Sequence, residues 1–279
     1  MTCGRTPAAA VYCWGQTVFA LDAVPTLASG SLALTGLSTG QDDVCGLTAA
    51  GAAYCWGANY YGEFGDGTVA PDSIPHAVSG ALVFSTVSAG GDYTCGLVSG
   101  AAYCWGSNTS GALGTGTRDS SLVPAAVGGG QTFTAISAGS SHACGLTAAG
   151  AAYCWGNGFG GATGDTLGLT VDSLPIAVPG GLSFSAISAG APHTCALAGG
   201  AAYCWGNNFW GNLGSAVSST PYPTLVTGGL SFVEIVAAGT HTCAISASGQ
   251  AYCWGDNTDG VGGDGTTAGR QVPTAVVQR

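Results

Sequence analysis

The sequence predicts an all-β protein, a closed β-propeller of six blades that each hold about four antiparallel strands and one disulfide-bonded hairpin. The tetrapeptide Tyr-Cys-Trp-Gly occurs six times, and a second cysteine precedes each copy by nine or ten residues. Glycine contributes 50 of the 279 residues and only 6% are charged, which is typical of a chain rich in turns. Because the self-similarity runs through the whole length, we predict one repeat domain, residues 1–279.

The segment between two paired cysteines has the features of a β-hairpin. Where the cysteines are nine residues apart, the two-residue turns Ser99-Gly100 and Gly199-Gly200 remain between the strands. Where they are ten apart, a three-residue loop ends in a glycine such as Gly150. This register places a glycine or alanine opposite the tyrosine of the motif, an arrangement that fixes strand pairing.

Opposed residues of a non-hydrogen-bonded pair have Cα atoms about 4.5 Å apart, a distance that a disulfide can span. Zinc coordination by the thiolates is the alternative. The pairs lack the tight spacing of zinc knuckles, and each repeat supplies only two ligands. We therefore predict six disulfides, Cys3–Cys13, Cys45–Cys55, Cys95–Cys104, Cys144–Cys154, Cys195–Cys204 and Cys243–Cys253.

Two further short strands complete each repeat. The pattern Phe-x-x-Ile-Ser-Ala-Gly precedes the hairpin, as at 133–139 and 184–190, and a strand with proline then valine follows it, as at 124–127. Four short strands in about 50 residues, without helical periodicity, are typical of a propeller blade. The N-terminal repeat lacks the Phe-x-x-Ile strand. We expect the last strand of the chain to complete the blade that the N-terminus begins. One strand is missing from the count, so either this blade is trimmed or the closing blade has three strands.

The segment 136–146, Ile-Ser-Ala-Gly-Ser-Ser-His-Ala-Cys-Gly-Leu, and the pattern Trp-Gly-x-Asn-x-x-Gly-x-Leu-Gly at 105–114 and 205–214 resemble repeats of the regulator of chromosome condensation family. The resemblance covers essentially the whole chain and implies a propeller with glycine-rich turns. Three differences stand out: cysteine replaces an apolar residue after the histidine position, the repeats number six rather than seven, and a basic tail is absent. The resemblance implies the fold but not nucleotide exchange on a nuclear GTPase, because oxidised cysteines argue against the nucleus and the net charge argues against histone-bound DNA. The sequence resembles a secreted bacterial branch of the family more.

Charge and hydropathy exclude several partners. The net charge is −10, lysine is absent, and the four cations are all arginine, whereas phosphate backbones and anionic membranes are bound through Lys and Arg. An unbroken apolar run of the roughly 18 residues needed for a membrane span is missing as well. Disulfides persist in oxidising compartments. We therefore expect a secreted or cell-surface protein without nucleic-acid partners or membrane insertion.

Large aromatic residues that do not recur in the repeat mark a candidate binding surface in the loops after Trp-Gly. Tyrosine and tryptophan supply contact area at low entropic cost and also stack on sugars. We expect a non-catalytic interaction module that binds a protein partner through one rim. The alternatives are lectin-like glycan binding and self-assembly into a surface layer or fibre. The predicted anchors are Tyr60, Tyr61, Phe159, Phe209 and Trp210.

Other polar residues are interpreted as structural. His142, His193 and His241 occupy the same position in successive repeats, so they are spread around a ring and are expected to form hydrogen bonds. The Gly-Asp-Gly-Thr segments at 65–68 and 263–266 lack the further acidic ligands of a calcium loop and are interpreted as turns. A nucleophile, base and orienting group cannot be assembled from the sequence. We therefore predict that the protein is not an enzyme and carries neither a cofactor nor a metal.

Overall fold

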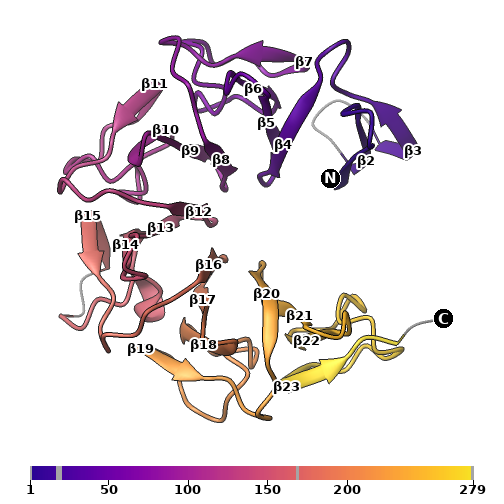
Figure 1. Cartoon of the computed structure of the whole chain (residues 1–279), viewed down its shortest axis with the longest axis vertical. Coiled ribbons are helices and arrows are strands. Elements are labelled where there is room, and N and C mark those ends of the chain that lie inside the picture. Colours follow the sequence, from indigo (N-terminus) through magenta and orange to yellow (C-terminus); the bar gives the residue numbers. More distant parts are fainter. Residues whose placement is uncertain (1, 17–20, 168–169, 278–279) are drawn as a thin grey trace.

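The computed structural model describes residues 2–16, 21–167 and 170–277. It confirms an all-β propeller of six blades, arranged around a central axis in chain order (Figure 1). Within these residues no helix is long and apolar enough to span a membrane.

Each blade is one antiparallel sheet whose strands follow one another in the chain, and the first strand of each four-stranded blade lies nearest the axis in Figure 1. The first blade has the three strands β1 (Thr2–Arg5), β2 (Val11–Gln16) and β3 (Leu21–Leu27). The second and third blades consist of β4 (Leu34–Thr39), β5 (Asp43–Thr48), β6 (Ala53–Gly57), β7 (Asp72–Ala77), β8 (Thr86–Ala89), β9 (Tyr93–Val98), β10 (Ala101–Gly106) and β11 (Ser121–Ala126).

The remaining three blades have the same order of strands. The fourth blade also carries a short 3₁₀ helix, η1 (Phe159–Gly161), in the loop after its third strand. The strands of these blades are β12 (Ala135–Ala138), β13 (His142–Leu146), β14 (Ala152–Asn157), β15 (Val171–Ala177), β16 (Ala186–Ala189), β17 (His193–Ala198), β18 (Ala201–Gly206), β19 (Thr220–Leu225), β20 (Phe232–Ala237), β21 (His241–Ser246), β22 (Ala251–Gly255) and β23 (Arg270–Ala275).

The predicted hairpin register and all six predicted disulfides are confirmed. The paired cysteines are directly opposed, with Cα atoms 4.0 to 4.1 Å apart. Gly96 lies opposite Tyr103, as the pattern predicted. In the two-residue turn Ser99 has φ 50° and Gly100 has φ 85°, the combination that a type I′ turn requires. Every cysteine is in a disulfide, which overturns the zinc alternative.

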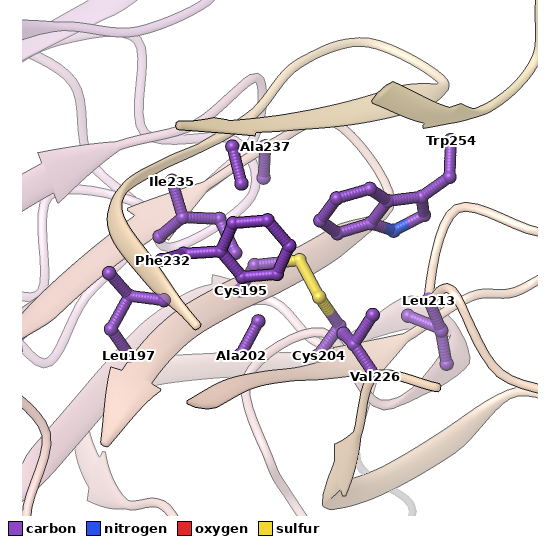
Figure 2. Packing of buried hydrophobic residues seen from close by; sticks show 11 residues of the cluster. Cys195, Leu197, Ala202, Cys204, Leu213, Val226, Phe232, Ile235, Ala237 and Trp254 are labelled. Atoms are coloured by element: carbon purple, nitrogen blue, oxygen red, sulfur yellow. A yellow bond between two sulfur atoms is a disulfide. The ribbon is translucent and has the colours of Figure 1, made fainter. Parts of the chain in front are cut away.

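The hydrophobic core lies between the blades rather than inside them. Figure 2 shows the interface of the fifth and sixth blades, where Phe232 and Trp254 pack against the Cys195–Cys204 disulfide and Leu197. Each of the five interfaces between consecutive blades has such a cluster. Each cluster holds the tryptophan of one Trp-Gly motif, the largest apolar side chain that the repeat supplies, whereas Trp14 of the first blade belongs to none of them.

The predicted closing blade, completed by the last strand of the chain, is wrong. β23 pairs with β22 in the last blade, and the first blade contains only β1, β2 and β3. Figure 1 shows these two blades standing apart, a place we call the seam. None of the core clusters formed by the described residues joins the first blade to the last. The physical reason is that β23 is already hydrogen-bonded to the outer edge of β22, so it is not free to pair with the first blade.

Candidate functional site

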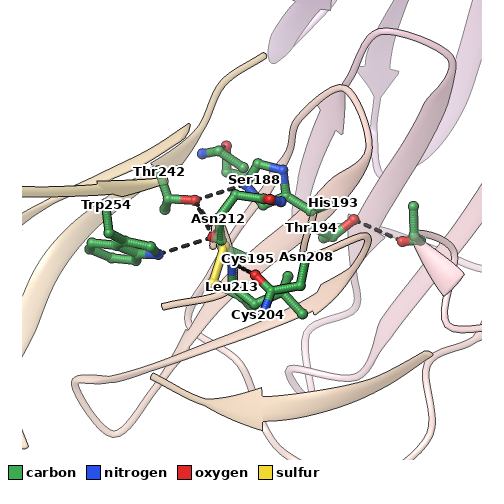
Figure 3. Close-up of a disulfide and its surroundings, with 12 residues drawn as sticks. Ser188, His193, Thr194, Cys195, Cys204, Asn208, Asn212, Leu213, Thr242 and Trp254 are labelled. Atoms are coloured by element: carbon green, nitrogen blue, oxygen red, sulfur yellow. Dashed lines mark hydrogen bonds between the residues drawn. A yellow bond between two sulfur atoms is a disulfide. The ribbon is translucent and has the colours of Figure 1, made fainter. Parts of the chain in front are cut away.

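Two of the three histidines of the repeat, His142 and His193, link neighbouring blades by hydrogen bonds. Figure 3 shows His193, whose Nε2 lies 2.7 Å from the Oγ1 of Thr242 in the next blade. Thr242 Oγ1 donates its own proton to the Asn212 carbonyl, 2.9 Å away, so it accepts from His193 Nε2–H. His142 makes the same contact with Thr194 at 2.8 Å. The predicted hydrogen-bonding role of these two histidines therefore agrees with the structure, and neither ring is accessible to a substrate.

These buried histidines make stability depend on pH. Burial lowers the pKa of His142 to about 4 and that of His193 to about 3. Between pH 6.5 and these values the unfolded chain binds protons that the folded chain does not. The stability associated with the neutral rings is therefore present above the unfolded pKa and is lost as the pH falls, by about 1.4 kcal/mol per pH unit for each ring.

We expect His142→Gln to reduce the slope of unfolding free energy against pH between about pH 6 and pH 4, the interval in which only the unfolded ring is protonated. The measurement is urea denaturation of the variant and the wild type at matched pH values. Burial and the nearby Glu63 carboxyl raise the pKa of Asp43. Protonation of Asp43 therefore stabilises the folded protein as the pH falls, which is opposite in sign to the effect of the histidines. The difference between the two proteins is therefore the readout. Parallel curves would contradict the assignment.

In four blades an asparagine holds the loop that follows the Trp-Gly motif; it is buried in the second, third and sixth blades and half-buried in the fifth. In the fifth blade, Asn208 Oδ1 accepts from the backbone N–H of Leu213 at 2.9 Å, and its Nδ2 donates to the Ser215 and Val217 carbonyls. Asn59, Asn108 and Asn257 make equivalent bonds in the second, third and sixth blades. The start and end of each loop are thereby tied to one side chain, which fixes the loop's position.

The predicted aromatic anchors lie in the first part of these loops, a few residues after the third strand. Phe209 is 82% exposed and Trp210 is 41% exposed, and their ring centroids are 5.1 Å apart in an edge-on arrangement. The Phe209 N–H donates to Asn207 Oδ1 at 2.8 Å, and the Phe159 N–H donates to Asn157 Oδ1 at 2.9 Å. In each of these turns the asparagine side chain accepts from the backbone N–H two residues later, which fixes the backbone of the residue that carries the exposed ring.

The structure brings some of the anchors together and leaves others apart. Phe209 and Trp210 form one contact pair in the fifth blade. Phe159 lies in η1 of the fourth blade, and this helix packs against β18 and β19 of the fifth. The exposed residues Tyr60 and Tyr61 are in the second blade, separated from the fourth by a complete blade. The geometry therefore favours a surface centred on the fourth and fifth blades.

His76 forms a polar cluster with two aspartates that the sequence did not predict. Its Nδ1 lies 3.0 Å from Asp66 Oδ2 and its Nε2 lies 3.0 Å from Asp72 Oδ2. The hydrogen bond with Asp72, reinforced by that with Asp66, raises the pKa of His76. A regular strand would hold residues four positions apart about 13 Å from each other, but Asp72 and His76 flank a register shift between β6 and β7 that brings them together. The spacing in the sequence therefore carries no signal of the pair.

Both Gly-Asp-Gly-Thr segments form turns. Asp66 Oδ1 accepts from the N–H and the hydroxyl of Thr68, and Asp264 Oδ1 accepts equivalently from Thr266. The second oxygen of Asp264 binds Arg270. Each carboxylate is thus engaged by its own turn and by the strand that follows it. Among the described residues, no three His, Cys, Asp or Glu side chains are grouped to hold a metal.

A cavity of about 580 Å³ lies on the axis of the propeller. It is lined by the ends of the inner strands of five blades, mostly Gly and Ala. Backbone bonds connect these ends from blade to blade, for example Gly91 N–H to Gly139 O at 3.1 Å and Ser140 N–H to Gly190 O at 3.0 Å. A lining so poor in functional side chains offers little for acid–base or nucleophilic chemistry.

Comparison with solved structures shows the same fold in proteins of low sequence identity. Human WBSCR16 superposes with a TM-score of 0.87 at 19% identity, covering 99% of this chain and 78% of that one. Prp20p from Saccharomyces cerevisiae gives 0.83 at 21% identity, covering 99% and 74%. The CRINKLY ectodomain of the Arabidopsis thaliana receptor kinase ACR4 gives 0.61 at 20% identity, covering 99% and 78%. No protein of curated function matches the sequence.

The repeat itself matches a known family model. The regulator of chromosome condensation (RCC1) repeat matches residues 50–97, 99–146 and 199–245, just over half of the chain. A second model of the same repeat matches residues 133–161 and 232–261. Propellers built from this repeat are generally interaction or exchange-factor domains rather than classical enzymes. Together with the six-bladed architecture, these matches place the chain in the regulator of chromosome condensation (RCC1) repeat family.

Proposed function

We propose that the protein is a non-catalytic extracellular interaction module that binds a protein partner through the loops of its fourth and fifth blades. The observation that carries the proposal is the exposed pair Phe209 and Trp210, held by turn hydrogen bonds on a loop that Asn208 fixes. Exposed aromatic residues on a rigid support lose little conformational entropy on binding and often dominate interface energies. Phe159 in the adjacent loop extends the same surface.

Two further observations support this function. The six disulfides suit an oxidising environment, and a similar propeller forms the ectodomain of a plant receptor kinase. The yeast protein Prp20p is described by its binding to Gsp1p and histones. This fold can therefore present a protein-binding surface, and here the loops with non-repeating residues are the part that differs from blade to blade.

Replacing both aromatic residues, Phe209→Ala with Trp210→Ala, is expected to weaken partner binding by at least about tenfold, as loss of a central anchor does. The matched control is Tyr222→Ala, which removes an exposed ring from the outer strand of the same blade. Each protein is immobilised and exposed to secreted and surface proteins of the source organism, and the retained proteins are quantified by mass spectrometry.

The proposal predicts a protein that wild type and Tyr222→Ala retain equally and that the double variant loses. Equal retention of every protein by all three would contradict it. A glycan array with the same three proteins tests the lectin alternative. Glycan binding that the double variant loses, without any lost protein, would replace the protein partner with a sugar. Circular dichroism and thermal unfolding establish that the double variant remains folded.

A further inference from the structure

The second, fourth and sixth blades have an aspartate at the same place, where the loop after Trp-Gly returns to the outer strand. Each aspartate follows the tryptophan of its motif by ten residues, and they are Asp66, Asp165 and Asp264. The outer strand then places a second residue beside each of them. The position that pairs with the glycine of Trp-Gly is Asp72 in the second blade, Asp172 in the fourth and Arg270 in the sixth. The charge beside the aspartate therefore differs among the three blades.

In the sixth blade this neighbour is a permanent cation. The Nε–H of Arg270 donates to Asp264 Oδ2 at 2.7 Å, and the two side chains form an ion pair. Hydrogen bonds from Thr266 and from Arg270 lower the pKa of Asp264 to about 2. Because arginine stays protonated in proteins, this contact between loop and strand does not change with pH while Asp264 is ionised.

In the fourth blade the two positions hold two carboxyl groups. Burial and the charge of Asp165 raise the pKa of Asp172. The outer-strand position opposite the second cysteine of the hairpin is Ile176 in this blade, whereas it is His76 in the second blade. Two acids at these positions therefore disfavour each other's ionised form when the third residue is apolar.

The second blade has the same two acids with a histidine between them. His76 Nδ1 lies 3.0 Å from Asp66 Oδ2, and its Nε2 lies 3.0 Å from Asp72 Oδ2. A neutral imidazole carries a proton on only one nitrogen, and an ionised carboxylate can only accept. Both contacts are therefore hydrogen bonds only when the ring is the doubly protonated imidazolium. The buried ring of Phe64 packs against this imidazole, with the ring centroids 5.3 Å apart.

The pKa shifts agree with this arrangement. The hydrogen bond with Asp72, reinforced by that with Asp66, raises the pKa of His76. The hydrogen bond from His76 lowers the pKa of Asp72. At Asp66 burial acts in the opposite direction, but the hydrogen bonds from Thr68 and from His76 outweigh it and lower the pKa. All three groups are thus stabilised in their charged forms, unlike Asp172 in the fourth blade.

The other charged or titratable groups of the elements around His76 point elsewhere. Glu63, in the same loop, accepts from the Tyr61 N–H at 2.8 Å. Tyr54 of the paired strand β6 lies opposite Ala77, and adjacent residues of a strand face opposite sides of the sheet. The third-blade strand beside the loop, β11, contains none of the charged residue types. The two aspartates are therefore the groups that hold the proton on His76.

Asp66 connects the histidine to the rest of the loop. Its Oδ1 accepts from the N–H and the hydroxyl of Thr68, and Asn59 Nδ2 donates to the same hydroxyl at 3.0 Å. The N–H of Gly67 donates to the Leu122 carbonyl of the third blade at 2.9 Å. The contact with His76 therefore holds the return of a loop that carries exposed aromatic residues in its first part.

We propose that the second blade carries a proton-operated latch, in which the imidazolium of His76 fastens the loop after β6 to β7 and loss of one proton opens it. The neutral ring can donate to one aspartate only, so the second carboxylate then faces a nitrogen lone pair and the two acids repel each other. The His76 side chain is 35% exposed, so its proton exchanges with the solvent.

The sign of the pH dependence follows from the direction of the shifts. Because the pKa of His76 is raised, the latch is closed at and below the ordinary value of about 6.5 and opens as the pH rises through the raised pKa. Because the pKa values of both aspartates are lowered, the latch stays closed in mild acid. The latch lies in the second blade and does not depend on the function proposed for the fourth and fifth.

Two matched backbone amides report on the latch in the intact chain. The N–H groups of Thr68 and Thr266 donate to the aspartates of their own turns, at 2.8 and 2.9 Å. Amide exchange is measured by NMR and corrected for the pH dependence of an unprotected amide. We expect protection of Thr68 to fall about two- to fivefold as His76 loses its proton, the size expected for a partly exposed ion pair. Protection of Thr266, whose aspartate is held by Arg270, is expected to stay constant.

Two variants separate the latch from ordinary packing. His76→Gln cannot become a cation, so we expect Thr68 to have the low protection of the open state at every pH. Asp72→Arg places a permanent cation at the position that Arg270 holds in the sixth blade. We expect this variant to keep Thr68 protected above the pH at which the wild type opens. Titration of ¹⁵N-labelled histidine in the wild type locates the loss of the proton from His76.

Three results would overturn the proposal, and all of them use the wild-type chain, so they stand even if a variant does not fold. One is a His76 ring that titrates at or below the ordinary value of about 6.5. Another is protection of Thr68 that stays constant while His76 titrates. The third is a parallel fall at Thr68 and Thr266, which would mean that both loops open independently of the histidine.

Discussion

Replacement of Trp155 by alanine is expected to lower the free energy of unfolding by about 3–5 kcal/mol, the range measured for large aromatic residues in a core. The side chain is fully buried between the third and fourth blades. Its Nε1–H donates to the Ala112 carbonyl at 2.8 Å, and its ring packs on Phe133. The substitution removes a large apolar volume and leaves a buried carbonyl without its donor, and both effects destabilise the fold.

Trp14→Ala is the matched control for this substitution. The residue has the same place in the repeat, but it lies at the seam and is partly exposed. We expect a loss of less than about 2 kcal/mol, because less apolar surface returns to water. Urea denaturation of both variants and the wild type supplies the comparison. Equal losses would contradict the conclusion that stability comes from packing between consecutive blades.

Reduction of the six disulfides is expected to unfold the protein at room temperature. Each bridge closes a loop of nine or ten residues, which contributes about 2.5–3 kcal/mol in the chain-entropy model. Their combined effect exceeds the net stability of about 5–15 kcal/mol that native domains have. Loss of the near-ultraviolet circular dichroism signal on adding a reductant measures the transition. A native spectrum after complete reduction would show that the blades fold without their bridges.

The bridges are also expected to differ in how fast they are reduced. Cys3 and Cys243, in the first and last blades, are partly exposed, whereas both cysteines of each bridge in the four central blades are buried. Thiolate attack on a disulfide requires access to the sulfur. Timed alkylation with peptide mapping should therefore find Cys3–Cys13 and Cys243–Cys253 opened first. A uniform rate would mean that global unfolding precedes every reduction.

Local sequence patterns predicted the blade because its hairpin depends on residues that are close in the chain. The spacing of Cys95 and Cys104 leaves only two residues for the turn, and Ser99-Gly100 can adopt the positive φ angles that such a turn requires. The same register determined the cysteine pairing. The periodic aromatic and glycine positions then predicted the number of blades, since each repeat forms one hairpin, flanked by a strand on each side in five blades and on one side in the first.

The sequence also marked candidate residues without placing them relative to one another. Tyr60 and Phe209 share the property of not recurring in other repeats, yet they lie three blades apart, and only Phe209 and Trp210 are in ring contact. His76 was overlooked because its partners come from a loop and a strand that meet only after folding. Whether these exposed aromatic residues bind a partner stays a prediction for the double variant to test.

The sequence by itself determined the fold class, the disulfide pairing and the turn conformations, because these follow from contacts within a single repeat. The tertiary structure alone decided that the first and last blades stand apart, which loops are neighbours and that, among the described residues, β1 pairs only with β2. These features depend on the packing of one blade against the next. A repeat pattern specifies each interface equally, so the different environments of Trp14 and Trp155 emerge only when the blades are assembled around the axis.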